Sequence, residues 1–118
     1  MNVAQFRRMA LGFDGAVEKA HMGHPDFRTP KGKIFATLHA DNTHGMVALT
    51  PEQQSRFVVH HPDAFAPAAG AWGRAGSTIV TLAAIDAETL GEAMTLAWQN
   101  KTVVSRQSSV RGRKTRKT

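Results

Sequence analysis

Apolar residues recur at helical spacing near the start of the chain. Between residues 3 and 13 an apolar side chain returns at every third or fourth position, directly after Asn2. The Asn2 side chain can cap a helix, and Gln5 stands where it can complete a capping box. The pattern predicts a helix over residues 3–11, which Gly12 ends.

Two more helices are indicated by their start signals. Thr50 can cap a helix whose first residue is Pro51, and we expect this helix to run to residue 60 or 61, because a proline follows. Asp86 can cap a last helix that ends at Asn100, and its apolar stripe consists of Leu90, Ala93, Met94, Ala97 and Trp98.

Alternating apolar and polar residues predict a hairpin between the first two helices. In residues 33–39, one sheet face is expected to carry Ile34, Ala36 and Leu38, and the other face Lys33, Phe35, Thr37 and His39. Turn-forming residues at 41–45 and an apolar stretch at 46–49 complete the hairpin.

The other strands are less regular. Residues 16–22 fit a strand loosely, Gly and Pro break residues 23–32 into short extended pieces, and residues 78–83 alternate as a strand. The glycine-rich residues 67–76 suit a loop, or a short strand with a tight turn. The order of these elements predicts an α+β domain over residues 1–100, in which an antiparallel β-sheet has helices packed on one face.

The basic residues are concentrated in the last part of the chain. Of the 15 Lys and Arg residues, seven lie in residues 101–118, where there is no acidic residue, and the net charge of the whole chain is +6. Such a segment cannot bury enough apolar surface to offset the entropy lost on ordering, so we expect a flexible basic tail. This tail is the electrostatic candidate for nucleic-acid binding, and its candidate contacts are Arg111, Arg113, Lys114, Arg116 and Lys117. A solvated tail that only aids solubility is an equal alternative.

A second group of cations lies just before the hairpin. Arg28, Lys31 and Lys33 stand close together in the sequence, between Phe27 and Phe35. Cations beside aromatic rings are typical of a nucleic-acid-binding wing or of a platform for single strands. The alternative is a solvated turn with both phenylalanines in the core. We favour this alternative, because three cations are too few to set a strong salt-dependent affinity by themselves.

Glycines surround Trp72 and Arg74. Gly70, Gly73 and Gly76 recur at every third residue, so their backbone amides could cradle a phosphate, with Arg74 adding charge. The spacing matches neither a P-loop nor the dinucleotide-binding fingerprint, so a tight connection with close backbone approach is favoured. Trp72 is expected in the core or at its rim, with an exposed stacking platform as the alternative.

Several classes of site are excluded or disfavoured. The chain has no Cys, which excludes disulfides, thiolate metal sites and cysteine nucleophiles, and fits a reducing compartment. Its six His residues lack the spacing of a metal site, and no Ser stands in a nucleophile elbow, so we expect no metal, no cofactor and no enzymatic activity. No apolar stretch reaches the ~20 residues of a membrane helix and no targeting segment is visible, so we expect a cytoplasmic protein.

Four stretches of the sequence resemble the MmcQ/YjbR-like proteins. They are residues 24–38 (HPDFRTPKGKIFATL), residues 62–67 (PDAFAP), residues 72–82 (WGRAGSTIVTL) and residues 96–100 (LAWQN). The resemblance implies a compact frataxin-like fold of the double-wing type, in a bacterial family often labelled DNA-binding, and it carries over no catalytic residue. The basic tail departs from the family, whose members commonly end soon after the last helix. Ser77 departs as well, because many members carry a Trp there.

The residues and the resemblance lead to one hypothesis, a non-enzymatic protein that binds nucleic acid, with double-stranded DNA expected, through phosphate contacts. The tail cations would attract the phosphates, while Arg28, Lys31, Lys33 and Arg74 would orient the folded body. The alternative is a small-molecule or protein interaction module with no nucleic-acid role, using a pocket near Trp72.

Overall fold

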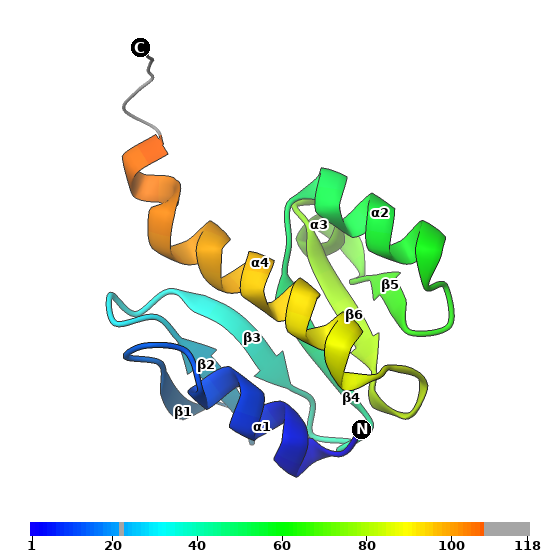
Figure 1. Cartoon of the computed structure of the whole chain (residues 1–118), viewed down its shortest axis with the longest axis horizontal. Helices are drawn as coiled ribbons and strands as arrows, with labels where there is room; N and C mark the ends of the chain where they lie inside the picture. The colour runs from blue at the N-terminus through cyan, green and yellow to red at the C-terminus, as the bar shows by residue number, and fades with distance from the viewer. Residues whose placement is uncertain (22, 108–118) are drawn as a thin grey trace.

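The computed structural model describes residues 1–21 and 23–107 of the chain. In chain order the elements are α1 (Val3–Leu11), β1 (Val17–His21), β2 (His24–Arg28), β3 (Ile34–Leu38), β4 (His44–Ala48), α2 (Pro51–His60), β5 (Phe65–Pro67), α3 (Gly70–Arg74), β6 (Ser77–Thr81), the 3-10 turn Leu82–Ala84 and α4 (Ala87–Gln107) (Figure 1).

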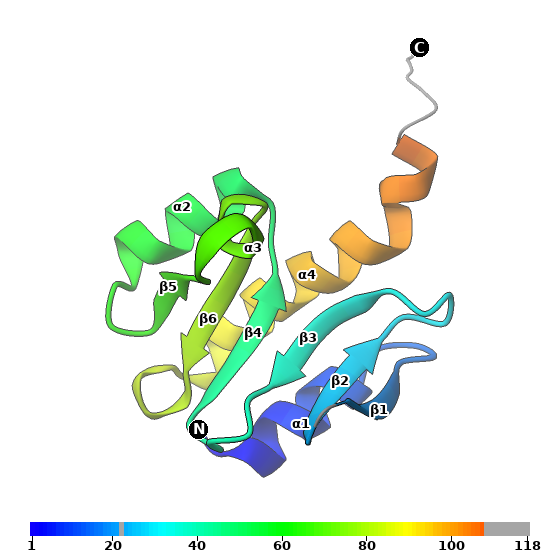
Figure 2. The same ribbon diagram turned by 180° about the vertical axis from the view of Figure 1, so that it is seen from behind.

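All six strands belong to one antiparallel sheet, in the order β1-β2-β3-β4-β6-β5. Helices α1, α2 and α4 lie on one face of the sheet, and α4 runs obliquely across its middle strands (Figure 1). Seen from behind, the middle strands β3 and β4 lie in front of α4 with no helix across them (Figure 2). The predicted α+β fold, with helices on one face of an antiparallel sheet, is confirmed. Within the described residues, no helix combines the length and the apolar character that a bilayer span needs.

The core fills the space between the sheet and these three helices. Its largest fully buried apolar side chains are Phe6, Phe27, Phe35, Phe65, Leu38, Leu90, Met94, Val47 and Val80. Burial of each contributes roughly 1.5–3 kcal/mol to the hydrophobic term, so the helix-covered face holds most of the stabilising contacts.

Capping boxes are present at the starts of both α1 and α2. The Asn2 side chain accepts a hydrogen bond from the Gln5 backbone at 2.8 Å, and the Gln5 side chain accepts one from the Asn2 backbone at 2.9 Å. Thr50 and Gln53 make the same reciprocal pair at the start of α2. The bounds of α1 and α2 therefore agree with the sequence pattern.

A β-bulge in β3 changes which side chains face the helices. The register pairs Phe27 with Ala36 but Arg28 with Ile34, so Phe35 is the extra residue on its strand. Strict alternation predicted Phe35 on the face opposite to Ala36. The prediction was wrong, because a bulge turns two successive side chains toward one side. Phe35 is instead fully buried against Trp98 of α4, with ring centroids 5.1 Å apart, and Ile34 is moved to the face without helices.

The glycine-rich connection contains a short helix, α3, where a loop or a short strand with a turn was predicted. Close backbone packing explains its glycines. A Cβ at Gly73 would lie 1.8 Å from the Ala68 carbonyl oxygen, and one at Gly76 would lie 1.9 Å from the Leu49 carbonyl oxygen. Gly76 also has φ +117°, which favours glycine.

Helix α4 continues to Gln107, past its predicted end at Asn100. The Asn100 side chain donates hydrogen bonds to the Ala48 carbonyl at 3.0 Å and to the Gln53 side chain at 2.8 Å, which fixes the helix to β4 and α2 at this point. Residues 101–107 are thus helical where composition predicted a flexible tail. The rest of that predicted tail, residues 108–118, lies outside the described residues.

Candidate nucleic-acid interface

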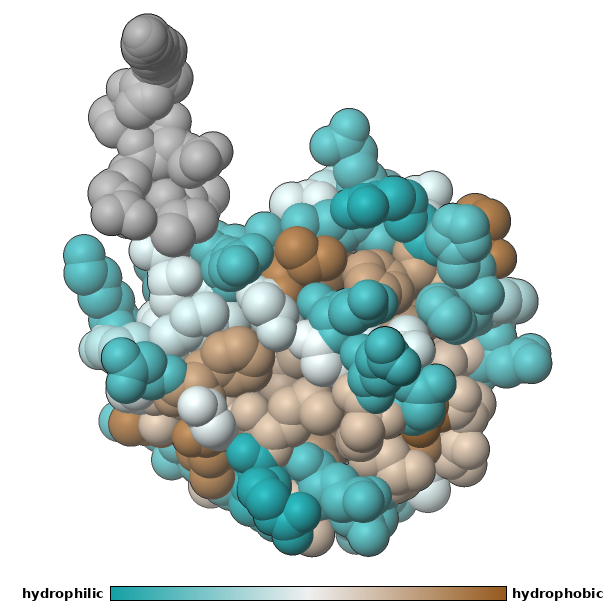
Figure 3. Space-filling model, in the orientation of Figure 1, coloured by the Kyte–Doolittle hydropathy of each residue, from teal (hydrophilic) through white to brown (hydrophobic). Residues whose placement is uncertain are grey.

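The antiparallel topology collects several connections at one end of the sheet. Three connections lie at this end: the one from α1 to β1, the hairpin loop between β2 and β3, and α3 between β5 and β6 (Figure 1). The C-terminal half of α4 reaches the same end (Figure 1). Hydrophilic side chains project at this end, where the hairpin loop lies (Figure 3). Segments far apart in the sequence are therefore close enough to share a binding surface.

A cavity of about 460 Å³ opens between the hairpin loop and α4. We call it the lysine pocket, and its lining residues are Asp14, Thr29, Pro30, Lys31, Lys33, Trp98, Lys101 and Thr102. The structure thus brings Lys31 and Lys33, two of the predicted nucleic-acid contacts, together with Lys101. Sequence analysis had assigned Lys101 to the tail.

The hairpin wall of the lysine pocket is held by a tight turn. The backbone N–H of Thr29 donates to the Lys33 carbonyl at 2.8 Å, and the Thr29 hydroxyl accepts from the Lys33 backbone at 3.2 Å. Gly32 adopts φ +88° within this turn. The α1–β1 connection packs against the same wall, because a Cβ at Gly15 would lie 2.7 Å from Cγ of Pro30.

The helix wall of the pocket is fixed by aromatic packing. Trp98 stacks on Phe13 with ring centroids 5.2 Å apart and meets Phe35 edge-on. The Thr102 hydroxyl donates to the Trp98 carbonyl at 3.0 Å, so the next turn of α4 is held beside the ring. Trp98 is half-buried and is one of the residues that line the cavity.

The cations of the pocket are not neutralised by neighbours. Lys31 and Lys33 are exposed and Lys101 is half-buried, and within the described residues none of the three forms an ion pair. Asp14 is the one acid among the lining residues. The pocket therefore carries a net positive charge that is available to an anion.

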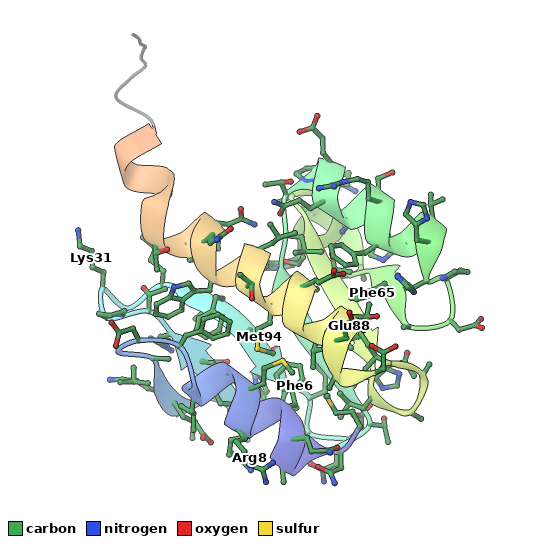
Figure 4. All side chains as sticks on the ribbon, viewed as in Figure 1. Phe6, Arg8, Lys31, Phe65, Glu88 and Met94 are labelled. Carbon is green, nitrogen blue, oxygen red and sulfur yellow. The ribbon has the colours of Figure 1, made fainter. Side chains whose placement is uncertain are left out.

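The opposite end of the sheet is acidic. Its β3–β4, α2–β5 and β6–α4 connections carry Asp41, Asp63 and Asp86, Glu88 lies in the first turn of α4, and these segments contain no Lys or Arg. Glu88 and Lys31 lie toward opposite ends of α4 (Figure 4). A backbone hydrogen bond from Thr89 lowers the pKa of Asp86, so this carboxylate is charged where the α4 dipole favours it.

Arg28, which was predicted to contact phosphates together with Lys31 and Lys33, lies apart from these two lysines. The register places it on the sheet face without helices, where its Nη2 atom lies 3.3 Å from Oδ2 of Asp26. Asp26 is only 2% exposed, so the guanidinium neutralises a buried carboxylate. Arg28 is thus engaged with Asp26, whereas Lys31 and Lys33 remain exposed.

Arg74 and Trp72 lie on α3, at the same end of the sheet as the pocket but outside its lining. The expectation that Trp72 packs in the core or at its rim was wrong, because its side chain is 77% exposed. The backbone of α3 packs closely against residue 68 at Gly73, while the Trp72 side chain projects to the surface. Trp72 is therefore an exposed surface side chain, on the same short helix as Arg74. The predicted contacts Arg111, Arg113, Lys114, Arg116 and Lys117 lie outside the described residues.

Comparison with known proteins identifies the family. A model of the YjbR family matches residues 11–100. The chain belongs to the YjbR family. Among curated proteins, none matches this chain.

Two solved structures resemble this YjbR-family protein in fold. A Deinococcus radiodurans protein with a DUF419 domain aligns with a TM-score of 0.71 at 20% identity, over 86% of this chain and 80% of that chain. A Pseudomonas syringae protein aligns with a TM-score of 0.67 at 16% identity, over 86% of this chain and 99% of that chain. At these identities the likeness concerns the fold.

The face of the sheet without helices carries His24, His39 and His44 near the acidic end of this YjbR-family protein. The ring centroids of His39 and His44 lie 6.2 Å apart. Burial lowers the pKa of His39, the Asp41 carboxylate opposes that shift, and His44 and His24 add to it. Within the described residues, no three His, Asp or Glu side chains are arranged to hold a metal ion.

One Asp–His–Thr group has the composition of a catalytic triad but a different geometry. The Asp41 carboxylate and the Thr43 hydroxyl lie 3.0 and 2.8 Å from the same nitrogen, Nδ1 of His44. A triad needs the acid and the nucleophile on the two different ring nitrogens. The Thr43 backbone N–H and the His44 side chain hold the pKa of Asp41 well below its ordinary value, as in a stable turn.

Sequence reasoning missed the roles of Trp98 and Lys101. Both were assigned to other features, Trp98 to the apolar stripe of the last helix and Lys101 to the tail. A usable signal was their spacing, since a cation three residues after an aromatic residue lies on the same side of a helix.

Proposed function

We propose that this YjbR-family protein is a non-enzymatic nucleic-acid-binding protein that holds the phosphate backbone at the lysine pocket. The observation that carries the proposal is the group of three lysines, Lys31, Lys33 and Lys101, at the C-terminal end of α4. None of the three forms an ion pair with a described residue, and the basic residues of the tail follow in the sequence. Phosphates are the common anions for which several convergent lysines and a cationic extension provide affinity without base specificity.

The charge distribution supports an oriented approach. Acids at one end of the sheet and lysines at the other give the molecule a polarity along α4, so a polyanion is attracted to the lysine end and repelled by the other. Arg111, Arg113, Lys114, Arg116 and Lys117 follow in the sequence and add five further positive charges. Arg74 on α3 offers a further phosphate contact outside the pocket. Arg28 contributes indirectly, because its guanidinium neutralises the buried carboxylate of Asp26.

The experiment is a titration of duplex DNA binding against salt with full-length variants. We expect that changing the three pocket lysines to Gln reduces the slope of log K against log salt by about 2–3, since each lost phosphate contact removes about 0.9. Changing the five tail cations to Gln is expected to reduce it by about 4–5.

The matched control loses the same charge elsewhere. Arg8, Lys19 and Arg56 are exposed cations outside the lysine pocket, and their joint change to Gln is expected to alter the slope by less than about 1. If the control and the pocket variant reduced the slope of log K against log salt equally, binding would depend on net charge alone. Absence of salt-dependent binding by the wild-type protein at low ionic strength would refute the proposal.

A binding role rather than catalysis is part of this proposal. It is supported by the shared nitrogen in the Asp41–His44–Thr43 group and by the exposure of that group, which lies outside the lysine pocket. A bacterial cytoplasmic setting is also proposed. Both solved relatives come from bacteria, and the chain has no Cys.

A second candidate function is a small-molecule binding module with no nucleic-acid role. The lysine pocket favours it, because a cavity of about 460 Å³ with an aromatic wall falls in the size range of small-molecule sites. Thermal stabilisation by anionic metabolites, in a protein that leaves duplex and single-stranded DNA unbound, would select this function.

A further inference from the structure

The lysine pocket has more space than a phosphate contact needs. Phosphate-binding lysines on a flat surface would serve a polyanion equally well, yet here they surround a cavity of about 460 Å³, and small-molecule sites range over roughly 300–1,000 Å³. Something other than a phosphate oxygen can therefore enter.

The lining combines two chemistries. Lys31, Lys33 and Lys101 provide cations, while Trp98 and Pro30 provide an aromatic and an apolar wall. A ligand that satisfies both has a flat ring joined to an anionic group. Stacking of a nucleic-acid base on an aromatic side chain is worth about 1–3 kcal/mol and tolerates any base.

The pocket is held in shape before any ligand arrives. The Phe13 and Phe35 rings fix the indole of Trp98, and the two hydrogen bonds between Thr29 and Lys33, one to a carbonyl and one to the Thr29 hydroxyl, fix the hairpin wall. Little conformational entropy remains to be lost in these walls on binding, so more of the contact energy contributes to affinity.

We propose that the lysine pocket takes one unpaired nucleotide of a nucleic-acid strand, with its base beside Trp98 and its phosphate between the three lysines. The inference rests on the proposed function and specifies its ligand. A paired base is stacked inside the duplex and reaches such a cavity only after unpairing, at a cost of a few kcal/mol. Single strands and unpaired ends are therefore preferred over uninterrupted duplex.

The test uses the full-length protein with Trp72→Ala. Trp72 and Trp98 are the two Trp residues of the chain. The substitution removes the exposed indole, which is a competing platform, and leaves Trp98 as the fluorescent probe. Two single-stranded oligonucleotides of equal length and charge are compared, one with bases and one abasic. We expect the oligonucleotide with bases to quench Trp98 and to bind about 5- to 150-fold more tightly, which corresponds to a stacking energy of about 1–3 kcal/mol.

The outcomes separate the two proposals. Equal affinities without quenching, or binding of duplex DNA alone, would overturn the nucleotide pocket and leave phosphate binding intact. Failure of both oligonucleotides and of duplex DNA to bind would overturn the proposed function itself. A free mononucleotide that binds as tightly as the strand would overturn the assignment to a strand, since the same ring and phosphate chemistry would then come from a soluble ligand.

A pocket-filling variant gives an independent test. Thr102→Met places a larger side chain in the cavity and so reduces its free volume. Thr95→Met makes the same change two turns earlier on α4, outside the lysine pocket. We expect the ratio of affinities for the base-containing and abasic strands to fall toward 1 in Thr102→Met and to stay unchanged in Thr95→Met. An unchanged ratio in both variants, each with a native circular dichroism spectrum, would overturn the proposal.

Discussion

At the scale of single residues, two glycines of this protein serve opposite purposes. Gly76 has φ +117° and allows the backbone to approach Leu49, where a Cβ would be 1.9 Å from the carbonyl oxygen. Gly91 lies in α4, and a Cβ there would meet nothing within 4 Å. One glycine is thus required by the fold, whereas the other is an unfavourable residue within a helix.

This contrast predicts opposite changes in the free energy of unfolding. Gly76→Ala is expected to lower it by roughly 2–6 kcal/mol, because backbone strain and overpacking each cost about 1–3 kcal/mol. Gly91→Ala is expected to raise it by about 0.5–1 kcal/mol. Urea unfolding of both variants measures the two values. A Gly76→Ala protein as stable as wild type would contradict the close approach of residues 49 and 76.

At the scale of elements, one side chain connects three of them. Asn100 of α4 donates to the Ala48 carbonyl at the end of β4 and to the Gln53 side chain of α2. Asn100→Ala leaves both acceptors without this donor and is expected to cost about 1–3 kcal/mol. The exposed neighbour Gln99 is the control, and Gln99→Ala should change stability by less than about 0.5 kcal/mol. Chemical denaturation compares the two, and equal stability would show that α4 is held by its apolar face alone.

The elements also show how far the sequence alone could lead. Caps and periodicity act within a few residues, so the bounds of α1 and α2 and their capping boxes could be predicted. The bulge that buries Phe35 could not, because strict alternation reads each strand without its partner. The lysine pocket depends on the meeting of Lys101 with a hairpin about 70 residues earlier, which local pattern does not encode. Lys31 and Lys33 could be predicted as candidate phosphate contacts, but the sequence did not show that Trp98 and Lys101 line the same pocket.

At the scale of the whole molecule, the separation of charge determines how salt affects binding. The molecule measures 45 × 31 × 27 Å, with the acidic connections and the lysine pocket at opposite ends of the sheet. The screening length of the solution is about 8 Å at 0.15 M ionic strength and about 30 Å at 0.01 M. Acids at the far end can therefore oppose a bound polyanion only when salt is low, whereas Asp14, which lines the pocket, opposes it at both salt concentrations.

Two full-length variants test how the distance of an acidic residue from the pocket determines its effect on DNA binding. Asp63→Asn with Glu88→Gln removes two exposed acids from the far end, and Asp14→Asn removes one from the pocket. We expect the first variant to bind DNA more tightly than wild type at about 0.01 M ionic strength and equally at about 0.15 M. Asp14→Asn is expected to bind more tightly at both, because a charge beside the bound phosphate is screened least. If the far-end variant gained as much as Asp14→Asn at the higher salt, the polyanion would have to contact the acidic end, and the assignment of the lysine pocket as its binding site would be wrong.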